Sequence, residues 1–128
     1  MSVLKGLYYT DQHEWVRVDG DIAVTGISDH AQELLGEITY VELPEVGFEV
    51  NKGSEIAVVE SSKAASDVYA PVSGKVVEVN ETLESAPELI NDDCYEDGWI
   101  CKIKMADASD VESLMDSSEY EAFLETVD

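Results

Sequence analysis

The sequence predicts a mainly β protein, a sandwich of strands with one short helix in its N-terminal third and helices at its C-terminus. Three hairpin-like signals predict this class: Asp19-Gly20 between two alternating strands, a second hairpin around Lys63, and a strand at 75–79 that follows Ser73-Gly74. Hydrophobic residues form 45% of the 128 residues, enough for a globular core.

The first hairpin is expected to pair 14–18 with 21–25 through a two-residue type I′ turn at Asp19-Gly20. A helix of about two turns should follow, because Ser28 is a good N-cap and Gly36 a typical helix terminator. The remaining strands are expected at 37–43, 75–79 and 99–105.

Two segments on either side of Lys63, 43–53 and 79–91, both have the turn chemistry of strand-loop-strand units. Their similarity suggests a sandwich with approximate two-fold symmetry.

The C-terminal part from Ser109 carries apolar residues at helical spacing in two segments. They are Val111, Leu114 and Met115, then Tyr120, Phe123, Leu124 and Val127. We expect one domain over residues 1–128, with a β body at about 8–105 and a helical tail at about 109–127 that covers an edge or face of that body.

The charge balance disfavours several partner classes. Twenty-nine acidic against 7 basic residues give a formal charge of −22, which repels nucleic-acid phosphates and anionic membranes. The acids favour solubility and attraction to proteins with basic docking surfaces. No apolar run approaches the roughly 20 residues of a membrane-spanning helix.

Residues 1–6 lack signal-peptide and transit-peptide features, so a cytoplasmic bacterial protein is expected, with a processed mitochondrial form as the alternative. Cys94 and Cys101 match no metal-binding or redox spacing and are interpreted as small core residues. The sequence predicts no metal site.

Lys63 is the candidate functional residue. It sits at the predicted hairpin tip between small residues, in a chain with few cations. An ordinary exposed turn lysine fits the same pattern. However, the chain has no nucleophile, phosphate-loop or dinucleotide motif, so a non-catalytic carrier whose chemistry resides in an attached cofactor is favoured over an enzyme.

The residues around Lys63 resemble the lipoylation motif of the glycine cleavage system H-protein family, and further blocks match that family in order. These blocks are 13–16, 26–32, 41–47, 60–67, 70–74, 87–91 and 98–99. The resemblance implies a barrel-sandwich hybrid fold of the lipoyl/biotinyl type, with lipoate joined to Lys63 by an amide. A monomer is expected, because a shuttle must be handed among several enzymes.

The resemblance further implies a set of partners. A pyridoxal-phosphate glycine decarboxylase would load an aminomethyl group on the arm, and a tetrahydrofolate-dependent aminomethyltransferase would remove it. A flavin-dependent dihydrolipoyl dehydrogenase would reoxidise the arm, and a lipoate ligase or lipoyl transferase would attach it. Glu14 and Asp67 occupy the positions that the family implies for contacts to the aminomethyl end.

Four other interpretations stay open. A biotin carrier is disfavoured because Ser62 and Ala64, rather than methionines, flank the lysine. The lipoyl domain of a 2-oxoacid dehydrogenase is disfavoured because such domains usually carry Asp before the lysine. A lipoate donor, or an unmodified interaction module of the same fold, is the remaining alternative.

Overall fold

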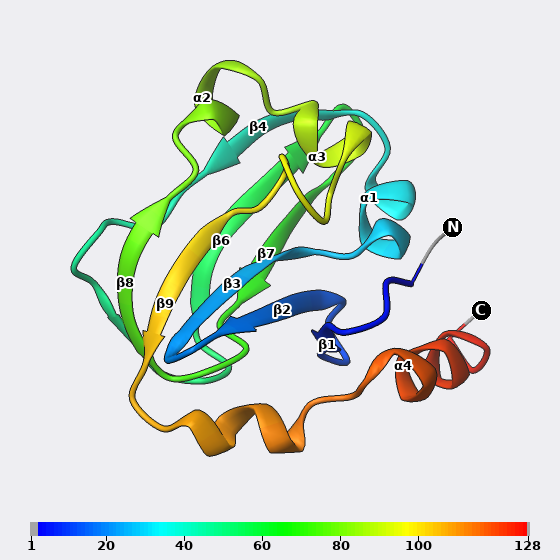
Figure 1. The fold of residues 1–128 in the computed structure, drawn as a ribbon. Coiled ribbons are helices and arrows are strands. Elements are labelled where there is room, and N and C mark those ends of the chain that lie inside the picture. The colour runs from blue at the N-terminus through cyan, green and yellow to red at the C-terminus, as the bar shows by residue number, and fades with distance from the viewer. Residues whose placement is uncertain (1–2, 128) are drawn as a thin grey trace.

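The computed structural model describes residues 3–127. Residues 1, 2 and 128, the ends of the expected single domain, lie outside the described residues. Two antiparallel sheets face each other (Figure 1), one six-stranded in the order β1-β2-β3-β9-β8-β5 and one three-stranded in the order β4-β6-β7. The strands are β1 Tyr8–Tyr9, β2 Glu14–Asp19, β3 Ile22–Ile27, β4 Ile38–Glu42, β5 Glu49–Val50, β6 Glu55–Ser61, β7 Ala65–Tyr69, β8 Gly74–Val79 and β9 Cys101–Met105.

The main core lies between the sheets. Val16 and Ile103 from the six-stranded sheet share one buried cluster with Val59 and Val68 from the three-stranded sheet. Burial alternates along β9, as expected for a strand with one face on the core. The mainly β class is therefore confirmed.

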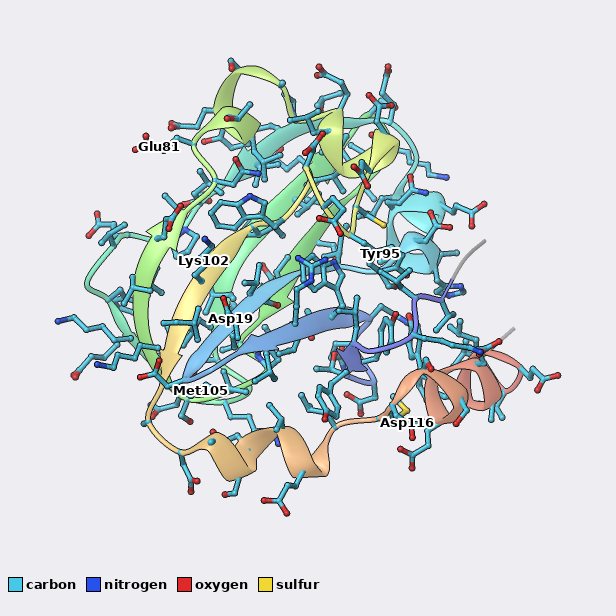
Figure 2. The ribbon with its side chains drawn as sticks, viewed as in Figure 1. Asp19, Glu81, Tyr95, Lys102, Met105 and Asp116 are labelled. Carbon is cyan, nitrogen blue, oxygen red and sulfur yellow. The ribbon has the colours of Figure 1, made fainter. Side chains whose placement is uncertain are left out.

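Carboxylates lie mostly outside this core. Figure 2 shows acidic side chains around the periphery, including the exposed Glu81 and Asp116. Glu14 is an exception, since its side chain is buried.

The first hairpin forms as predicted, but its turn differs. Asp19 pairs with Ile22, so the two loop residues are Gly20 and Asp21. Only Gly20 has a positive φ, at 63°. A positive φ at the first loop position alone is characteristic of a type II′ turn, so the type I′ prediction is wrong.

The short helix is confirmed as α1, Asp29–Leu35. The Ser28 hydroxyl accepts a hydrogen bond from the Ala31 N–H (3.3 Å), and Gly36 ends the helix with a φ of 82°.

The predicted similarity of 43–53 and 79–91 is not realised. The first segment forms a loop followed by β5, whereas the second contains two short helices, α2 Thr82–Ser85 and α3 Leu89–Asp92. Leu83 and Ile90 are fully buried, so each helical turn serves to place one apolar side chain in the core. The strand-loop-strand prediction at 79–91 is therefore wrong.

The C-terminal tail contains the 3-10 helix η1, Ala108–Ser113, and the α-helix α4, Ser117–Leu124. A capping box between Asp116 and Glu119 begins α4. Tyr9 and Met115 exchange two backbone hydrogen bonds of 2.8 and 2.9 Å, which hold the tail beside β1 (Figure 1). A second buried cluster lies here, and its members include Tyr9, Trp15, Tyr95 and Tyr120.

Candidate functional site

Lys63 occupies the tip of the hairpin formed by β6 and β7. The Ser61 N–H donates to the Ala64 carbonyl at 2.7 Å, which leaves Ser62 and Lys63 as the two loop residues. The Ser61 hydroxyl also accepts from the N–H groups of Lys63 and Ala64, at 3.3 and 3.1 Å. These hydrogen bonds of Ser61 fix the backbone of Lys63 at the hairpin tip, the position that the sequence predicted for it.

The Lys63 side chain is exposed, and the structure records no hydrogen bond or ion pair at its Nζ within residues 3–127. It lies over Gly36, where a Cβ added to the glycine would be 3.8 Å from Nζ. Ser62, Ala64 and Ala65 beside it are small and exposed. The amine is thus open to a modifying enzyme.

Several other cations contact polar partners instead. The pairs are Arg17 with Glu96 (3.2 Å), Lys102 with Glu78 (3.3 Å), Lys104 with Asp21 (4.0 Å), and Lys52 with the Ser113 hydroxyl. Lys63 differs from these residues because no polar partner is recorded at its Nζ among the residues that the structure describes and because it lies on a hairpin turn.

Glu14 lies in a groove of about 350 Å³ between the β1–β2 turn, the end of β7 and the C-terminal tail. Its side chain is only 2% exposed. The carboxylate accepts hydrogen bonds from the Thr10 hydroxyl (2.5 Å) and the Tyr69 N–H (3.2 Å). Burial raises the pKa of Glu14, and the negative charge of Asp11 raises it further, while the two hydrogen bonds partly oppose this rise.

Asp67 is exposed and does not line this groove. It precedes Tyr69 by two positions on β7, so the two side chains share a face of the strand. Because β7 is an edge strand of its sheet, this stretch lies beside the open edge that leads from the Lys63 turn to the groove. The structure therefore places Glu14 in the groove and Asp67 outside it, on β7 between the Lys63 turn and Tyr69.

The sequence did not identify Thr10 and Tyr69 as parts of this site. Thr10 lies in a turn after β1, a two-residue strand too short to give a periodic signal. The Tyr69 contact is made by its backbone N–H, which carries no side-chain signature.

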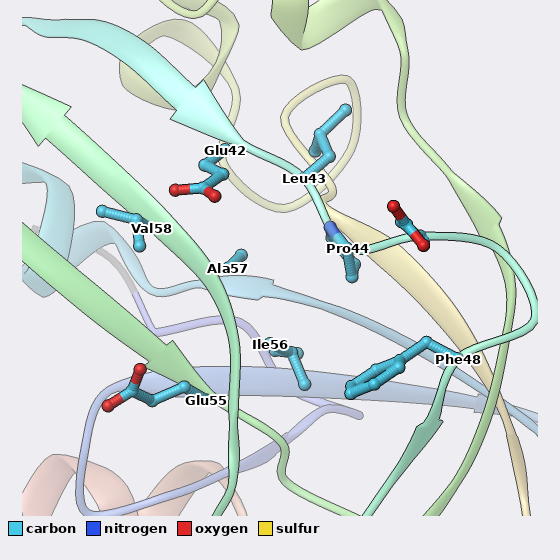
Figure 3. A pocket seen from close by; sticks show the side chains of 9 residues that line it. Glu42, Leu43, Pro44, Phe48, Glu55, Ile56, Ala57 and Val58 are labelled. Atoms are coloured by element: carbon cyan, nitrogen blue, oxygen red, sulfur yellow. The ribbon is translucent and has the colours of Figure 1, made fainter.

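A second groove, of about 440 Å³, lies on the three-stranded sheet and the loop after β4 (Figure 3). Ile56 and Ala57 contribute apolar side chains, and Phe48 at its edge is 53% exposed. Glu42, Glu45 and Glu55 are its charged lining residues, and no basic residue lines it in the described part of the chain. Its chemistry suits a segment that carries both apolar and cationic groups.

Neither cysteine offers a reactive thiol. Cys94 and Cys101 are free and buried, and burial raises the pKa of each to about 12. Within residues 3–127 no group of three or more His, Cys, Asp or Glu side chains is placed to hold a metal ion. The same residues contain no helix long and apolar enough to cross a membrane.

Comparison with known proteins agrees with these features. A family model described as glycine cleavage H-protein matches residues 7–127. The chain is 52% identical to a glycine cleavage system H protein from Parvibaculum lavamentivorans, over 97% of this chain and 99% of the relative. It is 55% identical to the mitochondrial glycine cleavage system H protein 2 of Arabidopsis thaliana, over 98% of this chain and 81% of that relative.

Among solved structures, the fold matches a glycine cleavage system H protein from Mycobacterium marinum with a TM-score of 0.88 and 36% identity, over 96% of this chain and 99% of that one. This neighbour confirms the lipoyl-type barrel-sandwich fold that the resemblance implied. The chain belongs to the glycine cleavage H-protein family, the lipoyl carriers of the glycine cleavage system.

Proposed function

We propose that Lys63 carries lipoate through an amide and that residues 1–128 act as a single carrier domain. The arm accepts an aminomethyl group from the pyridoxal-phosphate glycine decarboxylase and delivers it to the tetrahydrofolate-dependent aminomethyltransferase. The resulting dithiol then passes its electrons to the flavin-dependent dihydrolipoyl dehydrogenase. The observation that carries this proposal is the unpaired amine of Lys63 on a fixed hairpin tip, in a chain of this family.

The carrier is non-catalytic in this proposal, because the attached cofactor supplies the chemistry and the protein supplies its position. The β6–β7 hairpin fixes the Lys63 backbone, while the side-chain stem leaves the attached group mobile. Tethering raises the effective concentration of the group at each partner's active site.

The groove around Glu14 is the proposed resting place of the loaded arm. Strand geometry of about 3.3 Å per residue places Asp67 about 13 Å, and Tyr69 at most about 20 Å, from Lys63. An extended lipoyl-lysine side chain spans about 15 Å by standard bond lengths. An arm laid along β7 therefore passes Asp67 and ends near the groove.

At the end of that path a primary ammonium would meet carboxylates. Asp67 is proposed to contact the aminomethyl group on its way, and Glu14 to hold it in the groove by a charge-assisted hydrogen bond. The buried position of Glu14 supports this role, because a group held there is shielded from water.

The acidic groove of Glu42, Glu45 and Glu55 is proposed to receive a basic, apolar-anchored segment of a partner enzyme of the system. Opposite charges steer such encounters and weaken with salt. A lipoate ligase or lipoyl transferase also has to approach Lys63, and the small residues beside it leave that approach open.

The compartment is proposed from relatives. Bacterial H proteins match over nearly the whole chain, which supports a cytoplasmic bacterial protein, and the mitochondrial relative keeps the processed mitochondrial form as the alternative.

Intact-mass analysis of protein from lipoate-supplied cells tests the central proposal. We expect a lipoyl-sized mass increment that Lys63→Arg abolishes and that the matched control Lys75→Arg, at an exposed strand position, retains. An unmodified wild-type chain beside an active ligase would favour the interaction module. Transfer of lipoate from this chain to a second protein would favour the donor role.

A further inference from the structure

The Tyr120 hydroxyl lies at the centre of a buried polar network that joins three parts of the chain. It is 2.7 Å from His13 Nδ1 in the β1–β2 turn and 2.7 Å from the Ser28 hydroxyl at the start of α1. The Tyr120 side chain is fully buried, and its ring stacks on Tyr9 with centroids 4.3 Å apart. One hydroxyl of α4 therefore ties the tail to both segments.

His13 adopts an unusual backbone conformation. Its φ of 71° makes it the one non-glycine residue with a positive φ among the described residues. The His13 N–H donates to the Thr10 carbonyl (3.2 Å), and the Thr10 N–H donates to the Glu14 carbonyl (2.9 Å). This is the three-residue hairpin loop that ends in a left-handed residue, a position that glycine fills at least cost.

A histidine at that position has a side chain that glycine lacks, and the recorded ring contacts and side-chain hydrogen bond of this imidazole are with α4 and α1. Besides its bond to Tyr120, its ring lies 4.6 Å from the His30 ring and 6.0 Å from the Phe123 ring. Phe123 in turn lines the groove that holds Glu14. The backbone of His13 thus lies in the β1–β2 turn, while its side chain is held by α4 and α1.

Glu14 directly follows His13 in the chain, and both of its carboxylate hydrogen bonds depend on the path of this turn. One comes from Thr10 within the turn, and the other comes from Tyr69 on the facing strand. If the turn shifted, the carboxylate would lose one of these partners or be exposed to water.

We propose that Tyr120 and His13 are positioning residues for the groove, because their hydrogen bond holds the β1–β2 turn against α4 and so keeps the Glu14 carboxylate buried in the groove that Phe123 also lines. Neither residue is proposed to touch the arm. The effect on a loaded arm rests on the proposed function, whereas the effect on the Glu14 carboxyl does not.

Two variants break the tether in different ways. Tyr120→Phe removes only the hydroxyl and keeps the ring that stacks on Tyr9. His13→Gly removes the imidazole and at the same time relieves the left-handed strain, so its fold should not be weakened by the backbone. Tyr40→Phe is the matched control, since Tyr40 is 53% exposed on β4.

The first measurement is the titration of the Glu14 carboxyl, followed by carbon-detected NMR in the unmodified protein. Its titration midpoint should fall toward that of an exposed glutamate in Tyr120→Phe and in His13→Gly, and stay at the wild-type value in Tyr40→Phe. Asp11, whose negative charge raises the pKa of this carboxyl, and Lys52, which also lines the groove, are unchanged in all three variants. If the two residues served only the stability of the fold, each change in midpoint would come with a proportionate loss of thermal stability. His13→Gly should change the midpoint without such a loss.

The second measurement is the lifetime of the aminomethylated arm in the lipoylated proteins. It should shorten by about threefold or more in both tether variants, because a small displacement of a binding group has a large effect. Wild-type titration midpoints in both variants would overturn the inference. Altered midpoints with no protection of the arm even in the wild type would instead contradict the proposed resting place of the arm.

Discussion

Glu14→Gln is the sharpest test of the groove, because it removes one charge and keeps the side-chain shape. In the wild type Glu14 is 2% exposed, and its carboxylate accepts hydrogen bonds from Thr10 and Tyr69. The glutamine oxygen can still accept one of these bonds, and its amide can donate to the Thr10 hydroxyl. The loss is therefore confined to the attraction for a cationic group in the groove.

The magnitude follows from that single contact. A hydrogen bond to a charged group contributes about 1.5–3 kcal/mol net. At about 1.4 kcal/mol per factor of ten, the equilibrium constant for holding the arm in the groove should fall by about ten- to 150-fold. The aminomethylated form should become correspondingly more exposed to hydrolysis.

The free energy of unfolding depends on Glu14 in a different way from the holding of the arm. Because burial raises the pKa of Glu14 above its ordinary value of 4.5, the folded state binds the carboxyl proton more tightly than the unfolded state does. The resulting stabilisation is complete below the ordinary pKa and is lost as pH rises through the raised pKa of the folded protein. At pH 7 we expect Glu14→Gln to change the free energy of unfolding by less than about 1 kcal/mol, without loss of fold.

The assay is the decay of the aminomethylated protein, followed by mass spectrometry, together with urea unfolding between pH 4 and 8. Glu112→Gln, at an exposed position of η1, controls for the loss of one negative charge. The acid dependence of stability should be weaker in Glu14→Gln than in the wild type. An unchanged lifetime of the loaded arm would refute the role of Glu14 even if the unfolding results agreed.

Two further predictions concern the scaffold and the partners. Gly74→Ala should destabilise the fold by about 3 kcal/mol in urea unfolding, since its methyl group would lie 2.1 Å from the Lys104 carbonyl oxygen, and a wild-type midpoint would contradict this packing. Association with a partner enzyme should slow steeply as salt rises, and a Glu42→Gln, Glu45→Gln double variant should flatten that slope in stopped-flow measurements. Equal slopes for variant and wild type would show that the partner does not use the acidic groove.

Local chemistry accounts for what the sequence predicted well. The Lys63 hairpin, the helix between Ser28 and Gly36, and the strand at β9 each have a turn residue, a cap or an alternating pattern beside them in the chain. Such signals act over a few residues, so they can be recognised without knowledge of the fold.

Tertiary packing decided the elements that were missed. The helices α2 and α3 are single turns whose apolar residues Leu83 and Ile90 are drawn into the core, so neither has a periodic pattern of useful length. The first part of the tail was expected to be helical, and it forms the 3-10 helix η1.

The groove itself joins residues that are distant in sequence. The family resemblance pointed to Glu14, but its burial depends on Tyr69, 55 residues later. The hydroxyl that ties down the preceding turn belongs to Tyr120, which is 107 residues from His13. No local pattern connects these positions, so nothing in the sequence indicated that Glu14 is buried whereas Asp67 is exposed.

The burial of Cys94 and Cys101 has a consequence for the proposed lipoyl group, whose ring is a cyclic disulfide. A thiolate attacks such a ring readily, and a pKa of about 12 leaves fewer than about one thiol in ten thousand ionised at neutral pH. Since both cysteines are also buried, a mixed disulfide between either thiol and the proposed lipoyl group is disfavoured in the folded chain. Electrons delivered to the proposed arm would therefore stay available for the next protein, without loss to the thiols of the protein itself.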